Sequence, residues 1–311
     1  MRERELVKAV QAGDLNKVRE MCEQGVDEDK AKEYGPDFRS SLLFAAIDYY
    51  IDYSTGSAVS HNTGHTEIVA YLLRRGANAN INEHLEEDDD PARKNQTPLH
   101  STARNGYKVI AALLIQNGGV VDAKWGATGY TPLAVAVSSY NSADAPDASE
   151  EKNERIFDTI RLLVENGADV NTRNNTKAEP DYIGSTILHR IAGRGNLIQY
   201  LVNAGADINA KDEMGMTPLH TAALYSKGAT TATTAQALIE AGANPNVRDN
   251  KEKTPLDYAQ NELLKALIQR SQAPKSSQAV IPETPAKGSG CMGIFAVVGT
   301  IVLVIVTLTL Q

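Results

Sequence analysis

The chain has 311 residues and a formal net charge of −8, with 31 Lys and Arg against 39 Asp and Glu. This balance argues against nucleic-acid binding, because the sequence offers no Lys/Arg stripe to displace phosphate counterions. The two cysteines, Cys22 and Cys291, stand near opposite ends and provide neither a disulfide framework nor a metal-ligand spacing. The N-terminus is charged and has no apolar signal segment, so we expect the bulk of the chain on the cytosolic side.

Two short patterns alternate along the chain. The first is TPLH or a close variant, at 97–100, 131–134, 186–189, 217–220 and 254–257. The second is Gly-Ala-Asp/Asn-x-Asn, at 76–80, 167–171, 205–209 and 242–246. The apolar helical stretches between them are too short to be stable alone, so neighbouring units must cover their apolar faces.

Together these patterns resemble the ankyrin repeat, whose period is about 33 residues. The resemblance spans roughly residues 4 to 270, and the units start near 4, 40, 97, 131, 186, 217 and 254, with the first and last as caps. It implies an all-α solenoid of helix-turn-helix units with β-hairpin fingers, forming one ankyrin repeat domain over 1–270. Thr should cap each first helix, Pro should occupy its first turn, and the Gly of the second pattern should end the second helix.

The spacing of the units is uneven. Two inserts of about 15 residues, near 48–63 and 141–155, fall between the two helices of their units, and insertions of this kind form loops. Neutral loop growth is the simpler explanation. The alternative is a contact surface in the first insert, where Tyr49, Tyr50 and Tyr53 cluster, because Tyr buries a large area at low entropic cost.

Trp125 stands where the repeat pattern has a polar fingertip residue. An exposed Trp at a fingertip, next to Lys124, is a candidate for partner binding; alternatively it folds back onto a neighbouring finger. The resemblance implies that fingertips and first-helix faces contact partners. The variable first-helix residues form a mild basic strip that suits an acidic partner segment: Arg104, Asn105, Arg190 and Arg194.

No constellation for catalysis is present in the sequence. The quartet histidines, His100, His189 and His220, are expected to join their own Thr to the backbone of the adjoining turn. His61 and His65 have an i, i+4 spacing, but nothing completes a metal site, and the acidic run at 86–90 lacks the spacing of a calcium loop. We therefore expect a protein that is not an enzyme, with no cofactor, metal or small-molecule substrate.

After residue 270 the composition changes. Residues 271–292 are rich in Ser, Ala and Pro and indicate a flexible linker. Residues 293–310 are uncharged and apolar, which predicts a transmembrane helix inserted as a C-terminal tail anchor. The flanking Lys275 and Lys287 predict a cytosolic repeat domain, and Cys291 is a possible acylation site at the membrane edge.

The sequence thus predicts a membrane-tethered scaffold that binds a partner protein. Two other functions remain open: a secreted effector of an intracellular bacterium that acts on host proteins, and a regulatory module of a channel or enzyme complex.

Overall fold

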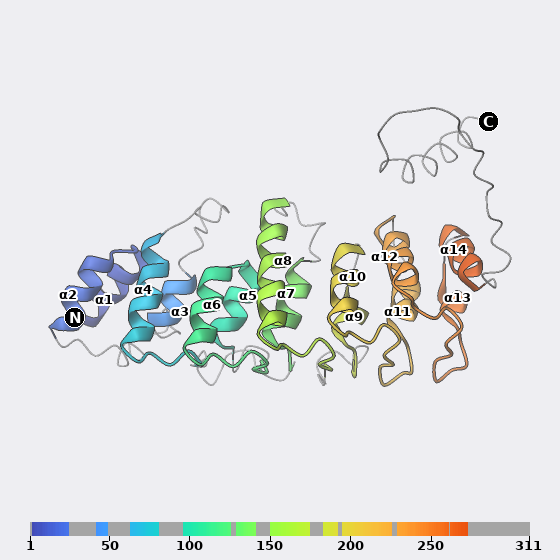
Figure 1. The fold of residues 1–311 in the computed structure, drawn as a ribbon, viewed down its shortest axis with the longest axis horizontal. Helices are drawn as coiled ribbons and strands as arrows, with labels where there is room; N and C mark the ends of the chain where they lie inside the picture. The colour runs from blue at the N-terminus through green and yellow to red at the C-terminus, as the bar shows by residue number, and fades with distance from the viewer. Residues whose placement is uncertain are drawn as a thin grey trace, which may run out of the picture. The chain divides into compact units, whose positions relative to one another are not determined.

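The computed structural model describes residues 2–24, 42–48, 63–80, 96–125, 129–140, 150–174, 183–191, 195–225, 229–260 and 262–272. All of them lie in one compact unit, Met1–Gln272. Within these residues the regular structure is α-helical, and the helices come in successive pairs (Figure 1). The prediction of an all-α solenoid is confirmed.

Each pair contributes a first and a second helix. The first helices are α1 (Arg2–Gln11), α3 (Leu42–Asp48), α5 (Pro98–Asn105), α7 (Pro132–Tyr140), α9 (Ile187–Arg190), α11 (Pro218–Leu224) and α13 (Pro255–Tyr258). The second helices are α2 (Leu15–Glu23), α4 (Thr63–Arg74), α6 (Lys108–Gln116), α8 (Glu150–Glu165), α10 (Gly195–Asn203), α12 (Ala229–Glu240) and α14 (Glu262–Gln272). Every first helix packs on the next first helix, so the pairs follow one another in chain order.

The core runs between the two rows of helices. The quartet leucines Leu99, Leu133, Leu188 and Leu219 are buried, together with apolar side chains of the second helices such as Ile110 and Leu201. Burial of one such side chain stabilises the fold by about 1.5–3 kcal/mol. Ala103 is also fully buried, and its small side chain suits the close packing of α5 on the neighbouring first helices.

The ends of the helices follow the predicted chemistry. Thr97, Thr186, Thr217 and Thr254 stand at the N-caps with extended backbones and form capping boxes with the residue three positions later. Pro occupies the first turn of α5, α11 and α13, where a missing N–H leaves no bond unmade. After the second helices, the four box glycines adopt left-handed backbones with φ between 89° and 101°, and Gly118, which ends α6, does the same with φ 86°.

The fingers differ from the predicted β-hairpins. The described residues contain an isolated β-bridge between Trp125 and Tyr130 but no strand. The turns that end before Thr217 and Thr254 are each closed by two backbone bonds. Asp212 N donates to the Met216 carbonyl and Asp249 N to the Lys253 carbonyl, both at 2.9 Å, and the carbonyls of Asp212 and Asp249 accept from Gly215 N and Glu252 N at 3.0 and 3.1 Å. Turns of this length leave too few residues to extend a ladder, so the fingers are compact turns that line one edge of the stack (Figure 1).

The second insert is partly helical. Residues 150–155, predicted to belong to it, form the start of α8, which has 16 residues where α6 and α10 have 9. In Figure 1, α8 accordingly extends past its neighbouring second helices. Residues 141–149 and 49–62 lie outside the described residues, and with them Tyr49, Tyr50 and Tyr53.

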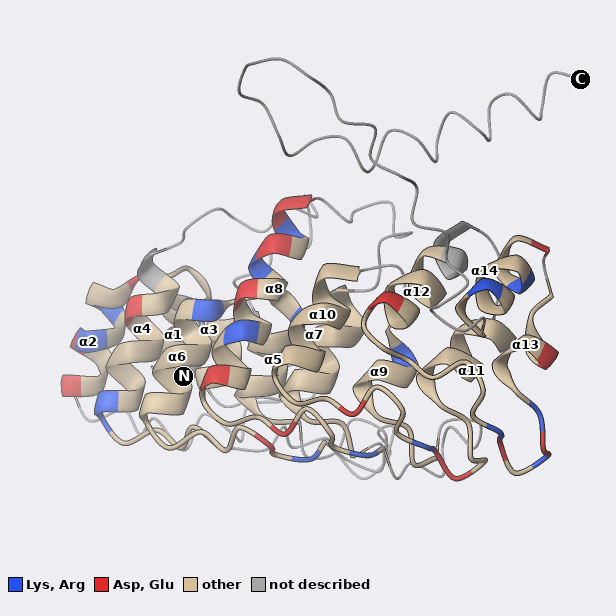
Figure 2. Cartoon of the chain, turned by 45° about the vertical axis from the view of Figure 1, so that its right-hand side comes forward, with Lys and Arg blue, Asp and Glu red and all other residues tan. Residues whose placement is uncertain are grey.

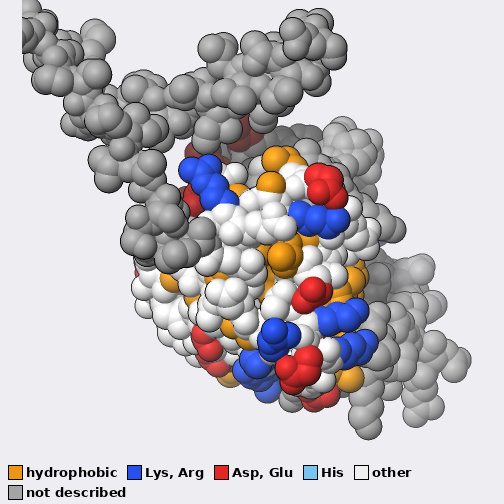
Figure 3. All heavy atoms as spheres, turned by 90° about the vertical axis from the view of Figure 1, so that its right-hand side faces the viewer, with side chains coloured by type: hydrophobic (Ala, Val, Ile, Leu, Met, Phe, Trp, Pro, Cys, Tyr) orange, Lys and Arg blue, Asp and Glu red, His pale blue; other side chains and the backbone are white. Residues whose placement is uncertain are grey.

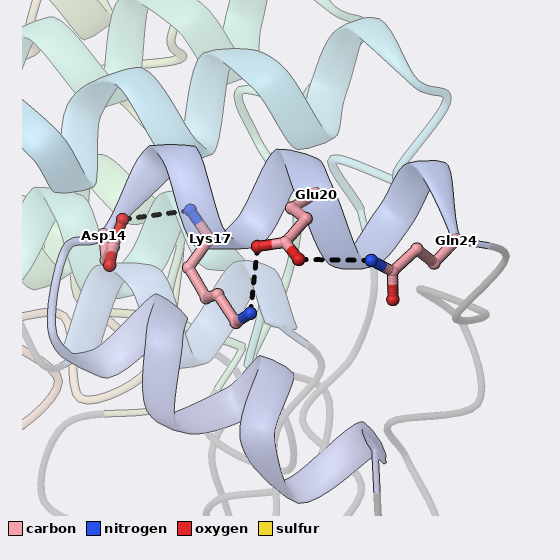
Figure 4. Close-up of polar contacts among 4 residues, drawn as sticks. All are labelled: Asp14, Lys17, Glu20 and Gln24. Carbon is pink, nitrogen blue, oxygen red and sulfur yellow. Dashed lines mark hydrogen bonds and ion pairs between the residues drawn. The ribbon is translucent and has the colours of Figure 1, made fainter.

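Both ends of the stack present polar side chains. On α2 the Asp14 side chain accepts from Lys17 N, and Lys17 Nζ binds Glu20, whose other carboxylate oxygen accepts from Gln24 Nε2 (Figure 4). At the other end, which carries α13 and α14, charged side chains of both signs divide the exposed apolar ones (Figure 3). Terminal repeats need such polar outer faces because no further repeat covers them.

Among the residues that the structure describes, no helix is long and apolar enough to span a membrane. The predicted transmembrane segment 293–310 and Cys291 lie outside those residues. The same holds for the linker from residue 273 onward, whereas residues 271 and 272 belong to α14.

Candidate partner-binding site

Four side chains on the first-helix side form a row of two arginines and two aromatic rings. Trp125 and Tyr130 pair across a tight turn, with Trp125 N donating to the Tyr130 carbonyl at 2.9 Å. The Arg104 guanidinium carbon lies 5.0 Å from the centroid of the Trp125 ring, and that of Arg190 lies 4.8 Å from the Tyr130 ring. We call these four residues the Arg–aromatic row.

The row is held by α5, by the turn that leads to α7, and by α9. Arg104 comes from the last turn of α5, Trp125 and Tyr130 from the turn that leads to α7, and Arg190 from the last residue of α9. All four side chains are half-buried. Each cation–π contact contributes about 0.5–1 kcal/mol at an exposed site and more where water is excluded. The contacts therefore hold two positive charges in defined positions.

Trp125 is less exposed than the sequence suggested. Its ring packs edge-on against His100 with 6.0 Å between the centroids, in addition to the contact with Arg104. It therefore folds onto its own repeat and contributes to the stability of the turn. Replacing it would disturb the fold as well as the surface.

The other predicted site residues differ in where the structure places them. Lys124 is exposed, directly before Trp125. Asn105 is half-buried, and its Nδ2 donates to the Ser101 carbonyl at 2.9 Å, which completes the last turn of α5. Arg194 lies outside the described residues.

Sequence reasoning missed Tyr130, although it directly precedes the Thr of a quartet. The signal was available: the residue before each quartet lies next to the fingertip, and an aromatic at this position can pair with Trp125 across the turn.

The first helices around the row are free of acidic residues. Helices α5, α7, α9 and α11 contain Arg104 and Arg190 and no Asp or Glu. The long second helix α8 carries charges of both signs, five acidic residues and three basic ones (Figure 2). A negative ligand is thus attracted more strongly to the first helices than to α8.

The quartet histidines connect each repeat to the next. Thr97 N donates to His100 Nδ1 at 3.1 Å, so that nitrogen is the acceptor, and His100 Nε2 then donates to the Tyr130 carbonyl at 3.0 Å. His189 and His220 make the same pair of bonds, reaching the carbonyls of Met216 and Lys253. The predicted structural role of these histidines is confirmed.

This geometry requires a neutral imidazole. Burial lowers the pKa of His100 to about 4 and lowers the pKa values of His189 and His220 as well. Protonation would put a hydrogen on Nδ1 and remove the acceptor for the backbone N–H of the capping Thr. The imidazoles are therefore fixed structural groups at neutral pH.

His65 also has a structural place. It is buried on α4, and its Nε2 lies 3.1 Å from the Gln11 carbonyl of α1. Across the described part of the chain, no group of three or more His, Cys, Asp or Glu residues could hold a metal ion. His61 lies outside that part.

Comparison with known proteins matches the repeats. The family described as ankyrin repeats (3 copies) matches residues 56–146 and 147–249, which is more than half of the chain. The neurogenic locus notch homolog protein 2 of Homo sapiens is 33% identical over 147 residues, covering 44% of this chain and 6% of that protein. An ankyrin repeat protein of fowlpox virus is 27% identical over 178 residues, covering 55% of this chain and 44% of the viral protein.

The chain therefore spans less than half the length of these relatives. Among solved structures, the ankyrin repeat domain of Bcl-3 superposes with a TM-score of 0.58 at 20% sequence identity, covering 85% of this chain and 97% of that domain. At this identity the likeness concerns the fold alone. The repeated quartets and glycine boxes, the paired helices and the matched family together lead to one conclusion: the chain belongs to the ankyrin repeat family.

Proposed function

We propose that this protein is a membrane-tethered scaffold that binds a partner protein through the first-helix side of its repeats. Ankyrin repeats are protein-interaction modules, which supports binding as the general function. The observation that carries the proposed site is the Arg–aromatic row, because arginines and large aromatic side chains are the residues that dominate binding energy at protein interfaces.

The partner contributes an acidic segment. Arg104 and Arg190 are positive charges on a set of helices without acidic residues, and the aromatic rings beneath them restrict their motion. An ordered guanidinium loses less conformational entropy when it binds a carboxylate. Neighbouring repeats lie about 10 Å apart and an extended chain rises about 3.3 Å per residue. Acidic residues about six positions apart in the partner would therefore reach both arginines.

The tether is the apolar stretch 293–310. It contains no charged residue, and as a helix its 18 residues would be about 27 Å long, close to the roughly 30 Å hydrocarbon core. The preceding Ser-, Ala- and Pro-rich residues would let the repeats move relative to the membrane.

Site-specific photo-crosslinking tests the binding site. A photoreactive amino acid replaces the exposed Lys124 beside the row, and in a control it replaces Val109, which is 62% exposed on the second helix α6. We expect crosslinks to a discrete protein from position 124 and none from position 109. Equal crosslinking at both positions would refute the proposed surface.

Membrane fractionation tests the tether separately. The full chain should stay in the membrane pellet after extraction at alkaline pH, and a chain that ends at residue 292 should be released. Release of the full chain under these conditions would exclude a membrane-spanning anchor without affecting the binding site.

A further inference from the structure

Three series of side-chain hydrogen bonds connect the repeats, and all three are altered between α7 and the turn that follows α8. The first series consists of the quartet histidines, whose Nε2 donates to the carbonyl just before the next quartet. The quartet of α7 has Ala134 in place of histidine, so the equivalent carbonyl, that of Ser185, receives no imidazole bond. The Ser185 side chain is 2% exposed, and its Oγ has no hydrogen-bond partner among the described residues.

The second series consists of side chains four residues after the glycine that ends each second helix. Asn171 accepts from the next turn at 2.8 Å and donates to it at 2.9 Å. Asp122 has the same position in the turn before α7 and accepts from Asp169 N at 3.1 Å, but a carboxylate has no hydrogen to donate. The bond that Asn171 donates therefore has no counterpart at Asp122.

The third series consists of basic side chains six residues after the same glycines. Arg173 Nη1 donates to the Lys211 carbonyl at 2.6 Å, and Lys211 Nζ donates to the Arg248 carbonyl at 2.9 Å. Lys124 has this position in the turn before α7, but it is exposed, and in the described part of the chain it makes no bond to the Arg173 carbonyl. All three alterations thus separate α7 and its leading turn from residues 167–185, and we call this place the α7/α9 boundary.

The helices also pack least closely at the α7/α9 boundary. α7 contacts α9 less extensively than any other two successive first helices contact each other, because α9 has only four residues, and the same holds for α8 and α10 among the second helices. Contacts that do cross the boundary include Phe157 against Tyr200, with 5.5 Å between the ring centroids, and Arg190 over Tyr130. The stability of a repeat stack is approximately a sum of repeat and interface contributions, so cooperativity is weakest where the interface is weakest.

We infer that the stack consists of two cooperative parts, the described residues up to 165 and those from 167 to 272, and that a partner bound to both Arg104 and Arg190 couples them. Arg104 belongs to the first part and Arg190 to the second. A ligand that bonds to both arginines adds a connection where the stack has the fewest of its own. The coupling rests on the proposed function, whereas the division into two parts does not.

Unfolding of the full chain by urea, in a nonionic detergent at neutral pH, tests the division. Trp125 is the only tryptophan of the chain and lies in the first part, so its fluorescence follows that part, whereas far-UV circular dichroism follows all the helices. We expect circular dichroism to show two steps and fluorescence to follow one of them, with midpoints about 1 M urea apart.

Variants in each part and at the boundary sharpen this test. His220→Ala weakens the second part, so it should move one step of the circular dichroism to lower urea and leave the fluorescence midpoint unchanged. The double variant Asp122→Asn/Lys124→Arg places at the boundary the residue types found in the intact series, so its two midpoints should approach each other. On this background, His220→Ala should lower the fluorescence midpoint as well.

Coincident transitions by both probes in the native chain would overturn the division. So would a fluorescence midpoint that falls in His220→Ala as far as the midpoint by circular dichroism.

Poly-L-glutamate, which presents closely spaced carboxylates, tests the coupling. It should bring the two midpoints of the native chain together and should leave those of Arg190→Gln apart. Two midpoints that poly-L-glutamate leaves unchanged in the native chain would overturn the coupling by an acidic ligand, and crosslinking at position 124 would then decide separately whether a partner binds at this surface.

Discussion

The quartet histidines act as neutral connectors between repeats. Their two ring nitrogens are assigned opposite roles by the backbone, since Nδ1 accepts from the capping Thr and Nε2 donates to the next turn. A carboxylate replaces the imidazole in the last repeat, where Asp257 accepts from Thr254 N at 2.7 Å.

Acidification should destabilise the stack through these histidines. The folded pKa of His100 is about 4, below the usual value of 6.5, so the stability is fully present above pH 6.5 and is lost as the pH falls toward 4. At a pH of about 5 the loss from His100 alone is about 2 kcal/mol, and His189 and His220 add to it in the same direction. Urea unfolding at neutral pH and at a pH of about 5 measures the difference in stability.

The variant His100→Asn provides the control for this pH dependence. It should be less stable at neutral pH, but its further loss on acidification should be smaller than that of the native chain. An unchanged midpoint of unfolding between neutral and mildly acidic pH would contradict the neutral-imidazole account.

Asp122 interrupts a ladder of asparagine side chains that joins the glycine boxes. Asn171 accepts from Asp207 N at 2.8 Å and donates through Nδ2 to the Gly205 carbonyl at 2.9 Å. Asn80 makes the equivalent two bonds, accepting from Val120 N and donating to the Gly118 carbonyl. Asp122 accepts from Asp169 N at 3.1 Å, but a carboxylate has no hydrogen to donate. Burial, followed by the nearby Asp169, raises the pKa of Asp122 even though the bond from Asp169 N lowers it.

Asp122→Asn should therefore stabilise the fold. A carboxylate with a raised folded pKa favours folding below its unfolded pKa, and this contribution is lost as the pH rises through the folded value. At neutral pH the native chain has lost this contribution completely, and the partly buried carboxylate is charged. The amide of Asn carries no charge to desolvate and restores a hydrogen-bond donor, so we expect a gain of about 1 kcal/mol in the free energy of unfolding.

The reciprocal change Asn171→Asp is the matched control and should lower the stability by a similar amount. Urea titration at neutral pH compares both variants with the native chain. A destabilised Asp122→Asn would show that the carboxylate has a role the ladder does not explain.

At the scale of the element, the approach of α8 to α5 depends on one glycine. Gly106 ends α5 with φ 73°, and a Cβ there would lie 2.7 Å from the backbone nitrogen of Ile156 on α8. Gly118 also has a left-handed backbone, with φ 86°, but a Cβ there would meet nothing within 4 Å. The two positions separate backbone strain from steric exclusion.

Gly118→Ala should cost about 1–2 kcal/mol of stability from strain alone. Gly106→Ala should cost about 3 kcal/mol or more, because the helices must also move apart. Midpoints of thermal unfolding for the two variants provide the comparison. Equal losses would mean that α8 accommodates a side chain at Gly106 without cost.

The sequence predicted the elements better than the contacts between them. The quartets and glycine boxes place the caps, the prolines and the left-handed turns, because each of these depends on local backbone chemistry. The helical residues 150–155 were missed, since an insert carries no repeat pattern of its own. The contacts of Trp125 could not be predicted, because they depend on how Arg104 and His100 lie against one ring.

The candidate site was predicted in part for the same reason. Arg104 and Arg190 occupy variable positions on first helices, so the repeat pattern alone places them on one side. The contact of Tyr130 and the missing bond at Ala134 lie between units, where residues distant in the sequence meet. The quartet TPLA did carry a signal, but its meaning depends on knowing that the other imidazoles reach the next repeat.

At the scale of the whole molecule, the repeats and the C-terminal stretch have separate tasks in the proposed function. The repeats provide a surface with two ordered arginines on the first-helix side, and the apolar residues 293–310 would hold that surface at a membrane. Loss of either part should abolish enrichment of the partner at the membrane. The remaining part should still bind the partner or the membrane, respectively.

Quantitative proximity labelling in cells tests this account most directly. The labelling enzyme is fused to the N-terminus of the full chain, of the double variant Arg104→Gln/Arg190→Gln, and of Arg161→Gln. Arg161 is the matched control, because its guanidinium carbon also lies over an aromatic ring, 4.5 Å from the centroid of Phe157, but on the second helix α8.

We predict that a discrete set of proteins with acidic segments is labelled by the full chain and by Arg161→Gln and lost in the double variant. The same labelled set in all three would contradict binding through the Arg–aromatic row, and no labelled protein above the background of an enzyme anchored by residues 273–311 alone would contradict the scaffold itself.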